Sequence, residues 1–167
     1  MTRRSLSAAD TKKLAAGLAR RVLRRGPGRK AIVIALRGEL GGGKTTFVQG
    51  FLRGLGLKRV SPSPTFILWR RFNLRRRDFR CVFHVDAYRI KKAGELFALG
   101  LGDILSKPEH IVLLEWPERL GRRLPQNAIR IEFLHGAKDN QRIITLRNTK
   151  KYEYTKRTGN ANSYIRK

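Results

Sequence analysis

One glycine-rich segment limits the folds open to this chain more than any other feature, and it reads Gly38-Glu39-Leu40-Gly41-Gly42-Gly43-Lys44-Thr45. Glycine, four residues, glycine, lysine and threonine form the Walker A pattern, which requires a strand before it and a helix after it. Residues 31–36 are an unbroken apolar run, typical of a strand buried on both faces, and residues 44–55 have apolar side chains at helical spacing. The segment and its flanks predict a P-loop α/β domain.

A loop of this kind holds phosphate mainly with its backbone. Glycines let successive N–H groups turn inward around an anion, and the N-terminus of the following helix adds partial positive charge. Lys44 can then reach the β- and γ-phosphates of a nucleotide, and the Thr45 hydroxyl can ligate magnesium. The alternative is an ordinary glycine turn before a helix, but the predicted strand and helix on either side argue against it.

The remaining patterns predict the elements around this loop. Ser7 followed by Asp10 marks the start of a helix over residues 7–25, and residues 95–105 indicate short helical pieces broken at Gly100 and Gly102. Strands are expected at residues 65–72 and 79–85, joined by an arginine-rich turn, at 111–114, and in a closing hairpin of residues 128–134 and 142–146.

These elements define the predicted fold and domain organisation. We expect a P-loop NTPase three-layer sandwich with a mixed, mainly parallel central sheet and β-hairpins. Residues 1–147 are predicted to form this single domain, because a chain of 167 residues has little room for a second core. Residues 148–167 are polar, basic and poorly patterned, and they are expected to form a flexible tail.

Two carboxylates follow apolar runs in equivalent positions. Asp86 ends the run from Val82 to Val85, and Glu115 follows Ile111-Val112-Leu113-Leu114. Ligands of open α/β sheets bind at the carboxyl ends of the strands, and phosphoryl chemistry needs a carboxylate near the metal. Either acid alone could instead be a helix cap or a surface residue, but two of them behind a P-loop favour a role in the site.

Three further residues have less specific signals. Thr65 follows a proline and could sense the γ-phosphate as a switch loop does, although Ser63-Pro64-Thr65 taken alone indicates only a turn. His84 alternates with Asp86 on one strand face, which predicts that both face one site, yet a lone histidine is more often structural. Trp116 is compatible with core packing or with a contact surface.

The charge of the chain is extreme. Thirty-eight Lys and Arg against twelve Asp and Glu give a net charge of +26. Such a charge attracts nucleic acid, but it also keeps proteins soluble, and both interpretations stay open. Residues 1–30 hold ten basic side chains and one acid, whereas residues 81–118 hold six acids and four basic side chains. The excess of cations is therefore concentrated away from the predicted metal site.

The cysteine count and hydropathy indicate the compartment. The single cysteine, Cys81, excludes an internal disulfide and leaves no basis for a cysteine-rich zinc site. The N-terminus has no apolar region like that of a secretory signal, and no apolar run reaches the roughly 18 residues of a membrane span. We therefore expect a cytoplasmic protein without membrane contact.

Four motifs in series resemble those of the bacterial TsaE family (formerly YjeE), the ATPases of tRNA threonylcarbamoyladenosine (t6A) biosynthesis. They are residues 38–46, Ser63-Pro64-Thr65-Phe66, His84-Val85-Asp86-Ala87-Tyr88-Arg89 and Leu114-Glu115-Trp116-Pro117. The resemblance covers residues 6–147. Gly42 departs from it where alanine is usual, and so does the additional proline Pro62, which is expected to stiffen the loop before Thr65.

The resemblance implies binding of ATP and Mg²⁺, slow ATP hydrolysis and work with the paired subunits TsaB and TsaD. Residues 38–46, Thr65 and Arg142 would contact the nucleotide, with Lys44, Thr45 and Thr46 on its phosphates. Thr45 and Glu115 would bind magnesium, Asp86 would position water or ligands of the metal, and Trp116 would be functional. Lys44, Asp86 and Glu115 are the predicted catalytic residues.

Two other functions stay open at this point. The first is a small-molecule kinase, in which the arginines of residues 70–80 would act as a lid over the phosphates. The second is an RNA-binding module whose nucleotide site has decayed, against which the intact Walker A residues argue. The basic surface and the tail leave direct contact with tRNA as a further expectation.

Overall fold

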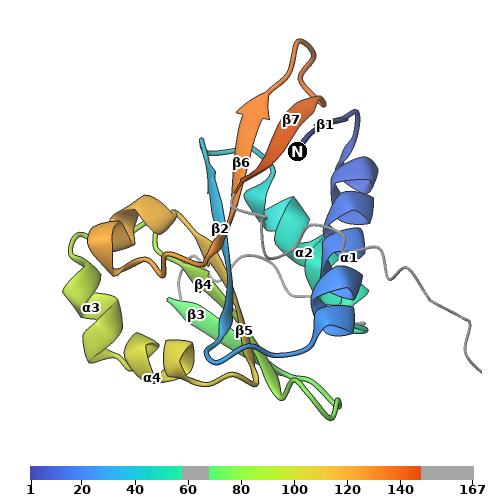
Figure 1. The fold of residues 1–167 in the computed structure, drawn as a ribbon. Helices are drawn as coiled ribbons and strands as arrows, with labels where there is room; N and C mark the ends of the chain where they lie inside the picture. Colours follow the sequence, from blue (N-terminus) through green and yellow to red (C-terminus); the bar gives the residue numbers. More distant parts are fainter. Residues whose placement is uncertain (58–67, 148–167) are drawn as a thin grey trace, which may run out of the picture.

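The structure is a computed structural model that describes residues 1–57 and 68–147. Its strands are β1 (Thr2–Ser5), β2 (Ile32–Gly38), β3 (Trp69–Asn73), β4 (Cys81–Asp86), β5 (His110–Glu115), β6 (Ile129–His135) and β7 (Arg142–Arg147). Its helices are α1 (Ala8–Arg25), α2 (Lys44–Gly54), α3 (Ala93–Ala98), α4 (Leu101–Ser106) and the 3-10 segment η1 (Pro117–Arg123). Figure 1 shows these elements along the chain.

The described strands form one mixed sheet in the order β1-β7-β6-β2-β5-β4-β3. The four central strands, β6, β2, β5 and β4, are parallel neighbours, while β3 and β7 pair antiparallel with β4 and β6. Because β7 is antiparallel to both β6 and β1, five of the seven strands run in one direction. The predicted mixed, mainly parallel sheet is confirmed.

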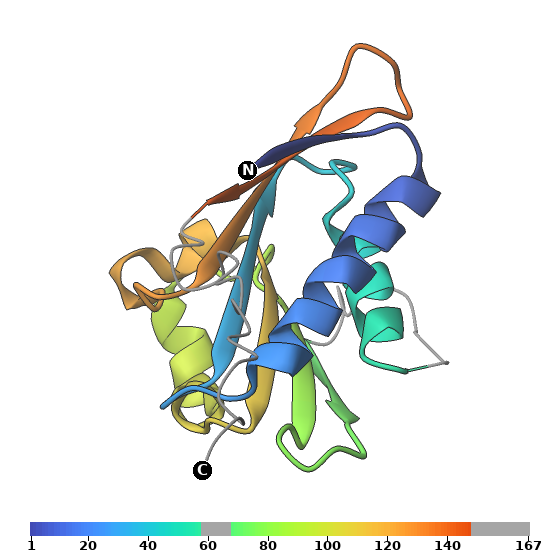
Figure 2. The same cartoon turned by 45° about the vertical axis from the view of Figure 1, so that its right-hand side comes forward.

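Helices cover both faces of the sheet, which makes three layers. In Figures 1 and 2, α1 and α2 lie on one face, and α3, α4 and η1 lie on the other. Side chains alternate along the buried strands: Ile32, Ile34 and Leu36 enter the core under α1 and α2, while Val33 and Ala35 enter the opposite core. Burial on both faces is the reason that β2 and β5 have unbroken apolar sequences.

The first helix begins and ends as its sequence predicts. The Ser7 side chain accepts a hydrogen bond from the Asp10 N–H at 3.1 Å, and the Asp10 carboxylate accepts one from the Leu6 N–H at 3.1 Å. Together these bonds satisfy two backbone donors at the start of α1. Gly26 ends the helix with φ of 77°. The predicted pairs at β3–β4 and β6–β7 are also confirmed as antiparallel neighbours.

Three details differ from the sequence prediction or lie beyond it. The predicted break at Gly102 is wrong: Gly102 lies inside α4, and α3 and α4 are separated by Leu99 and by Gly100, which has φ of 98°. The edge strand β1 was not predicted. Residues 62–66, which include Thr65, and the predicted tail lie outside the described residues. The division into a domain of residues 1–147 and a tail stays a prediction.

Candidate functional site

The glycine-rich loop connects the carboxyl end of β2 to the N-terminus of α2. Gly38 has φ of 153°, and a Cβ atom there would lie 2.7 Å from the carbonyl oxygen of Phe133 on the neighbouring strand β6. Gly43 precedes α2 with φ of 98°, a left-handed conformation. Glycine is thus required at both ends of the turn. No side chain caps the start of α2 in the described structure, so its first N–H groups are available to an anion.

Lys44, the first residue of α2, is folded back over this loop. Its Nζ atom donates to the carbonyl oxygens of Gly38 and Glu39, each at 2.8 Å, and lies 4.1 Å from the centroid of the Trp116 ring. Burial lowers the pKa of the Lys44 ammonium group, and the carboxylates of Glu115, Asp86 and Glu118 oppose that shift. The ammonium group is therefore held beside both the loop and the acidic end of the sheet.

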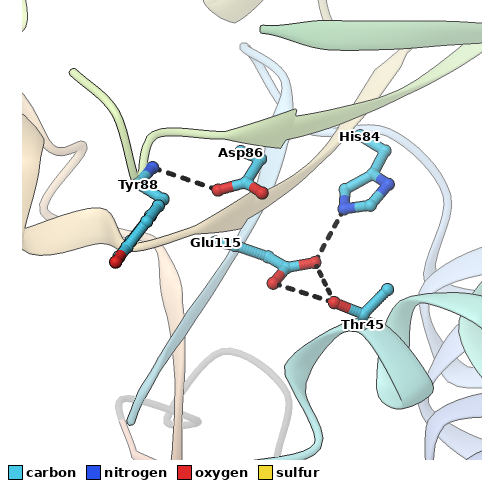
Figure 3. Close-up of polar contacts among 5 residues, drawn as sticks. All are labelled: Thr45, His84, Asp86, Tyr88 and Glu115. Carbon is cyan, nitrogen blue, oxygen red and sulfur yellow. Dashed lines mark hydrogen bonds and ion pairs between the residues drawn. The ribbon is translucent and has the colours of Figure 1, made fainter. Parts of the chain in front are cut away.

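Glu115 connects the loop helix to the central strands through two hydrogen-bond partners (Figure 3). The Thr45 hydroxyl on α2 donates to its two carboxylate oxygens at 3.1 and 3.2 Å. The Nε2 atom of His84 on β4 lies 2.8 Å from Oε1. Glu115 and His84 are each 2% exposed. A carboxylate buried this deeply is retained because both neighbours satisfy it.

Asp86 lies next to Glu115, since the two residues are direct partners in the pairing of β4 with β5. One oxygen of Asp86 accepts a hydrogen bond from the Tyr88 N–H at 3.0 Å. The Tyr88 ring packs on Trp116 with centroids 5.0 Å apart. Trp116 itself has φ of 59°, which is unusual for a residue with a side chain. This backbone conformation directly follows the carboxylate and turns the chain into η1.

Arg142 approaches the loop from β7. Its Nη2 atom donates to the carbonyl oxygen of Gly41 at 3.0 Å, and Nη1 donates to the carbonyl oxygens of Asp139 and Gln141. Its Nε atom is buried and has no hydrogen-bond partner among the described residues. One guanidinium group thus joins the glycine-rich loop to the β6–β7 hairpin and adds positive charge beside the loop.

The glycine-rich loop, the start of α2 and the ends of β4 and β5 enclose a cavity of about 250 Å³ at the carboxyl ends of the parallel strands. It is lined by residues 40–46 together with Asp86, Tyr88, Glu115 and Trp116. The described residues include no group of three or more His, Cys, Asp and Glu side chains that could hold a metal ion. The Thr45 hydroxyl and the Glu115 carboxylate instead fit Mg²⁺, which usually keeps several waters and binds one or two carboxylates plus substrate phosphates.

The sequence profile of the family described as "Threonylcarbamoyl adenosine biosynthesis protein TsaE" matches residues 5–144. The chain belongs to the TsaE family. The resemblance that the four motifs indicated is therefore confirmed.

Three curated relatives of the TsaE family carry the name "tRNA threonylcarbamoyladenosine biosynthesis protein TsaE". The protein from Bacillus subtilis is 36% identical over 113 residues, 68% of this chain and 67% of the relative. The protein from Haemophilus influenzae is 35% identical over 104 residues, which are 62% of this chain and 63% of the relative. The protein from Treponema pallidum is 32% identical over 114 residues, which are 68% of this chain and 80% of the relative. The match thus spans about two thirds of the first two relatives.

A solved structure agrees with the fold of this TsaE-family chain. The crystal structure of YdiB from Bacillus subtilis is similar with a TM-score of 0.66 and 27% sequence identity, over 87% of this chain and 83% of that chain. The predicted P-loop fold is confirmed.

In this member of the TsaE family, the structure brings most of the predicted site residues together. Lys44, Thr45, Asp86 and Glu115 share one cavity with the loop, and Arg142 contacts that loop. Thr65 lies outside the described residues. Sequence reasoning favoured a structural role for His84, yet His84 contacts Glu115 directly. It assigned no role to Tyr88, although Tyr88 belongs to the motif of residues 84–89 that carries the family resemblance.

Proposed function

We propose that this chain is a Mg²⁺-dependent ATP-binding and ATP-hydrolysing component of the t6A modification machinery of tRNA, acting with TsaB and TsaD. Membership of the TsaE family and the names of the relatives support the pathway. One structural observation carries the chemistry: the Thr45 hydroxyl of the Walker A loop donates to the buried carboxylate of Glu115. That pair joins the phosphate-binding helix to the acidic end of the sheet.

In this proposal each residue around the cavity has a defined task. The loop amides, Lys44 and Thr46 would hold the phosphates, with Arg142 adding charge from β7. Thr45 and Glu115 would hold Mg²⁺, which when bound neutralises charge on the phosphate oxygens. Asp86, next to Glu115, would orient water by accepting a hydrogen bond from it. Thr65 keeps its proposed role as a sensor of the γ-phosphate.

The position of the arginine-rich turn argues against its role as a kinase lid. A kinase lid would have to reach the phosphates, but the arginine-rich turn lies at the far end of α2. Arg76 donates to the carbonyl oxygen of Leu55 at 3.4 Å, at the opposite end of α2 from Lys44. An 11-residue helix separates its ends by about 16 Å. The pairing of Asn73 with Cys81 likewise puts the turn at the start of β4, while Asp86 ends that strand.

Turnover and partner binding test the proposal together. Phosphate release from ATP should be lost in Lys44→Ala and in Glu115→Ala, with melting curves showing that both variants fold. Immobilised chain should retain TsaB and TsaD in a manner that depends on ATP. Undiminished hydrolysis in both variants would refute the site, and rapid phosphorylation of a metabolite would favour the kinase.

The location follows from the same proposal. None of the described helices is long and apolar enough to cross a membrane. The proposed role in tRNA modification agrees with the cytoplasmic location that the sequence predicts.

A further inference from the structure

The outer side of α1 carries a basic groove that is separate from the nucleotide cavity. Five cationic side chains line it: Arg4 from β1, and Lys13, Arg20, Arg21 and Arg24 from α1. The hollow between them has a volume of about 650 Å³. Figure 2 shows α1 on the outside of the molecule, beside β1. We call this surface the α1 groove.

The charges of the α1 groove are not neutralised within the described structure. The ion pairs His84–Glu115 and Arg147–Glu132 involve none of these side chains. Asp10 is the acid of the groove, and its carboxylate already accepts the Leu6 N–H. Five cations and one carboxylate leave a net charge of +4 on this surface. Arg4, Lys13, Arg20 and Arg24 are exposed, so their charged ends are accessible to a partner.

The cations follow one side of the helix. Lys13, Arg20 and Arg24 are spaced by seven and four residues, which puts them on one face over about 16 Å of helix axis. Gly17 lies between them, and a Cβ atom at Gly17 would meet nothing within 4 Å. The floor of the groove is therefore open to close approach by a ligand, and positively charged side chains are spaced along its length.

The groove's chemistry is suited to phosphate. Four of its five cations are arginines, whose planar guanidinium groups bind phosphate oxygens in pairs. Insertion into a membrane needs a free apolar face, but that face of α1 is used in the core by Ala15, Leu18, Ala19 and Val22. None of the described residues that line the groove is aromatic, so they offer bases no ring on which to stack. A repeating phosphate backbone matches such a surface.

We propose that the α1 groove binds the phosphate backbone of RNA, without reading its sequence. None of the residues that line the groove also lines the nucleotide cavity. RNA binding at the groove therefore does not require the ATP site. A test of this proposal can fail without affecting the proposed ATPase function. The proposal assigns a role to five of the ten basic side chains of residues 1–30.

Two charge-matched variants of the full chain test the proposal. The groove variant carries Lys13→Gln, Arg20→Gln, Arg21→Gln and Arg24→Gln, since glutamine has nearly the helix propensity of the residues replaced. The control carries Lys107→Gln, Arg119→Gln, Arg122→Gln and Arg130→Gln, four exposed cations outside the groove. Each variant removes four charges from +26 and has a net charge of +22. A difference between them reports on location, not on total charge.

The measurement is fluorescence anisotropy of a labelled, unmodified tRNA transcript over a series of KCl concentrations. The groove variant should lose at least about tenfold in affinity, and the slope of log K against log salt should fall by about three to four. The double variant Arg20→Gln/Arg24→Gln should lower the slope by about two. The control should stay close to the parent chain, and melting temperature and ATP affinity should stay unchanged in all variants.

Several results would overturn the proposal. An equal loss in the groove variant and the control would assign binding to total charge. An unchanged groove variant would remove the groove from RNA binding. If phosphatidylserine vesicles or polyglutamate bound as tightly as the transcript and competed with it through the same four residues, the groove would be a general anion surface.

Discussion

The Nε2 atom of His84 lies 2.8 Å from the Oε1 atom of Glu115, and both side chains are buried between the sheet and α2 (Figure 3). An ionised carboxylate only accepts hydrogen bonds, so Nε2 carries the proton in this contact. The Thr45 hydroxyl donates to the same oxygen from the other side. His84 is therefore a positioning residue that holds the Glu115 carboxylate toward the P-loop helix.

Replacing His84 should weaken metal binding more than it weakens the fold. We expect His84→Ala to lower the apparent affinity for Mg²⁺ in the presence of ATP by about 10- to 100-fold, the usual effect of losing a residue that orients a metal ligand. His84→Gln keeps an N–H donor and should retain more of this affinity. Calorimetric titration of ATP binding at a series of Mg²⁺ concentrations measures both variants.

His110 provides the matched control, because it is a buried histidine at the start of β5, whereas Glu115 ends that strand. Its ring packs on Phe83 with centroids 4.9 Å apart, and its Nδ1 atom lies 3.0 Å from the carbonyl oxygen of Ile104. His110→Ala should reduce the free energy of unfolding but leave the Mg²⁺ dependence unchanged. Equal losses of Mg²⁺ affinity in both variants would show that His84 acts through stability alone.

The Thr45 hydroxyl can be tested with two substitutions of similar size. Thr45→Val replaces the hydroxyl with a methyl group and removes the donor to Glu115, so we expect nucleotide affinity in Mg²⁺ to fall by about 10- to 100-fold, the equivalent of a hydrogen bond to a charged group. Thr45→Ser keeps the hydroxyl and should retain most of the affinity. A valine variant that binds nucleotide as tightly as the parent chain would show that the hydroxyl contact with Glu115 does not contribute to affinity.

We expect Arg142 to contribute to nucleotide binding through the shape of its guanidinium group. It joins the carbonyl oxygen of Gly41 to those of Asp139 and Gln141, a set of contacts that a lysine ammonium group cannot reproduce. Arg142→Lys should therefore weaken binding of a non-hydrolysable ATP analogue by about tenfold, the effect of a lost hydrogen bond of about 1.5 kcal/mol. Calorimetry measures the affinity directly.

The control for Arg142 lies at the other end of the same strand. Arg147 forms an exposed ion pair with Glu132 at 3.1 Å. Since exposed pairs contribute little, Arg147→Lys should leave nucleotide affinity unchanged. A parallel decrease in both variants would assign the effect to the charge of β7 and not to the contact with Gly41.

The fold was largely predictable because its central strands are buried on both faces. Apolar runs at β2 and β5 allow few other interpretations, and the Walker A glycines fix the turn between β2 and α2. The edge strand β1 left no such pattern. Its sequence, Thr2-Arg3-Arg4-Ser5, is mostly exposed and is held by main-chain pairing with β7, which does not depend on apolar side chains. Gly102 is the opposite case, in which the sequence predicted a feature that is absent. A glycine often ends a helix, but Gly102 has ordinary helical geometry and lies inside α4.

The site was predictable residue by residue, but its contacts were not. Strand ends indicated Asp86 and Glu115, because parallel strands bring their carboxyl ends to one edge. The contact of His84 with Glu115 depends on the register in which His84 pairs with Leu113, and the sequence of neither strand specifies that register. Arg142 contacts a loop residue 101 positions away, and this depends on β6 pairing with both β2 and β7.

The helix that carries Lys44 and Thr45 is held against α1 by a close approach at Gly50 and Gly54. A Cβ atom at Gly50 would lie 2.5 Å from the carbonyl oxygen of Lys12, and one at Gly54 would lie 2.6 Å from the Cα atom of Ala16. These two glycines are four residues apart and therefore share one face of α2. No side chain can occupy either position unless the two helices move apart.

Gly50→Ala should therefore destabilise the protein, although alanine is the better helix former. Overpacking should cost about 1–3 kcal/mol in the free energy of unfolding and the better helix propensity should return about 1 kcal/mol, so we expect a net loss of up to about 2 kcal/mol. Gly17→Ala is the matched control in the middle of α1, where a Cβ atom meets nothing within 4 Å, and it should stabilise by about 0.5–1 kcal/mol. Urea unfolding of both variants gives the comparison. If both were stabilised equally, the close approach of α2 to α1 would have no energetic consequence. The nucleotide affinity of Gly50→Ala should fall as well, because any displacement of α2 also moves Lys44 and Thr45.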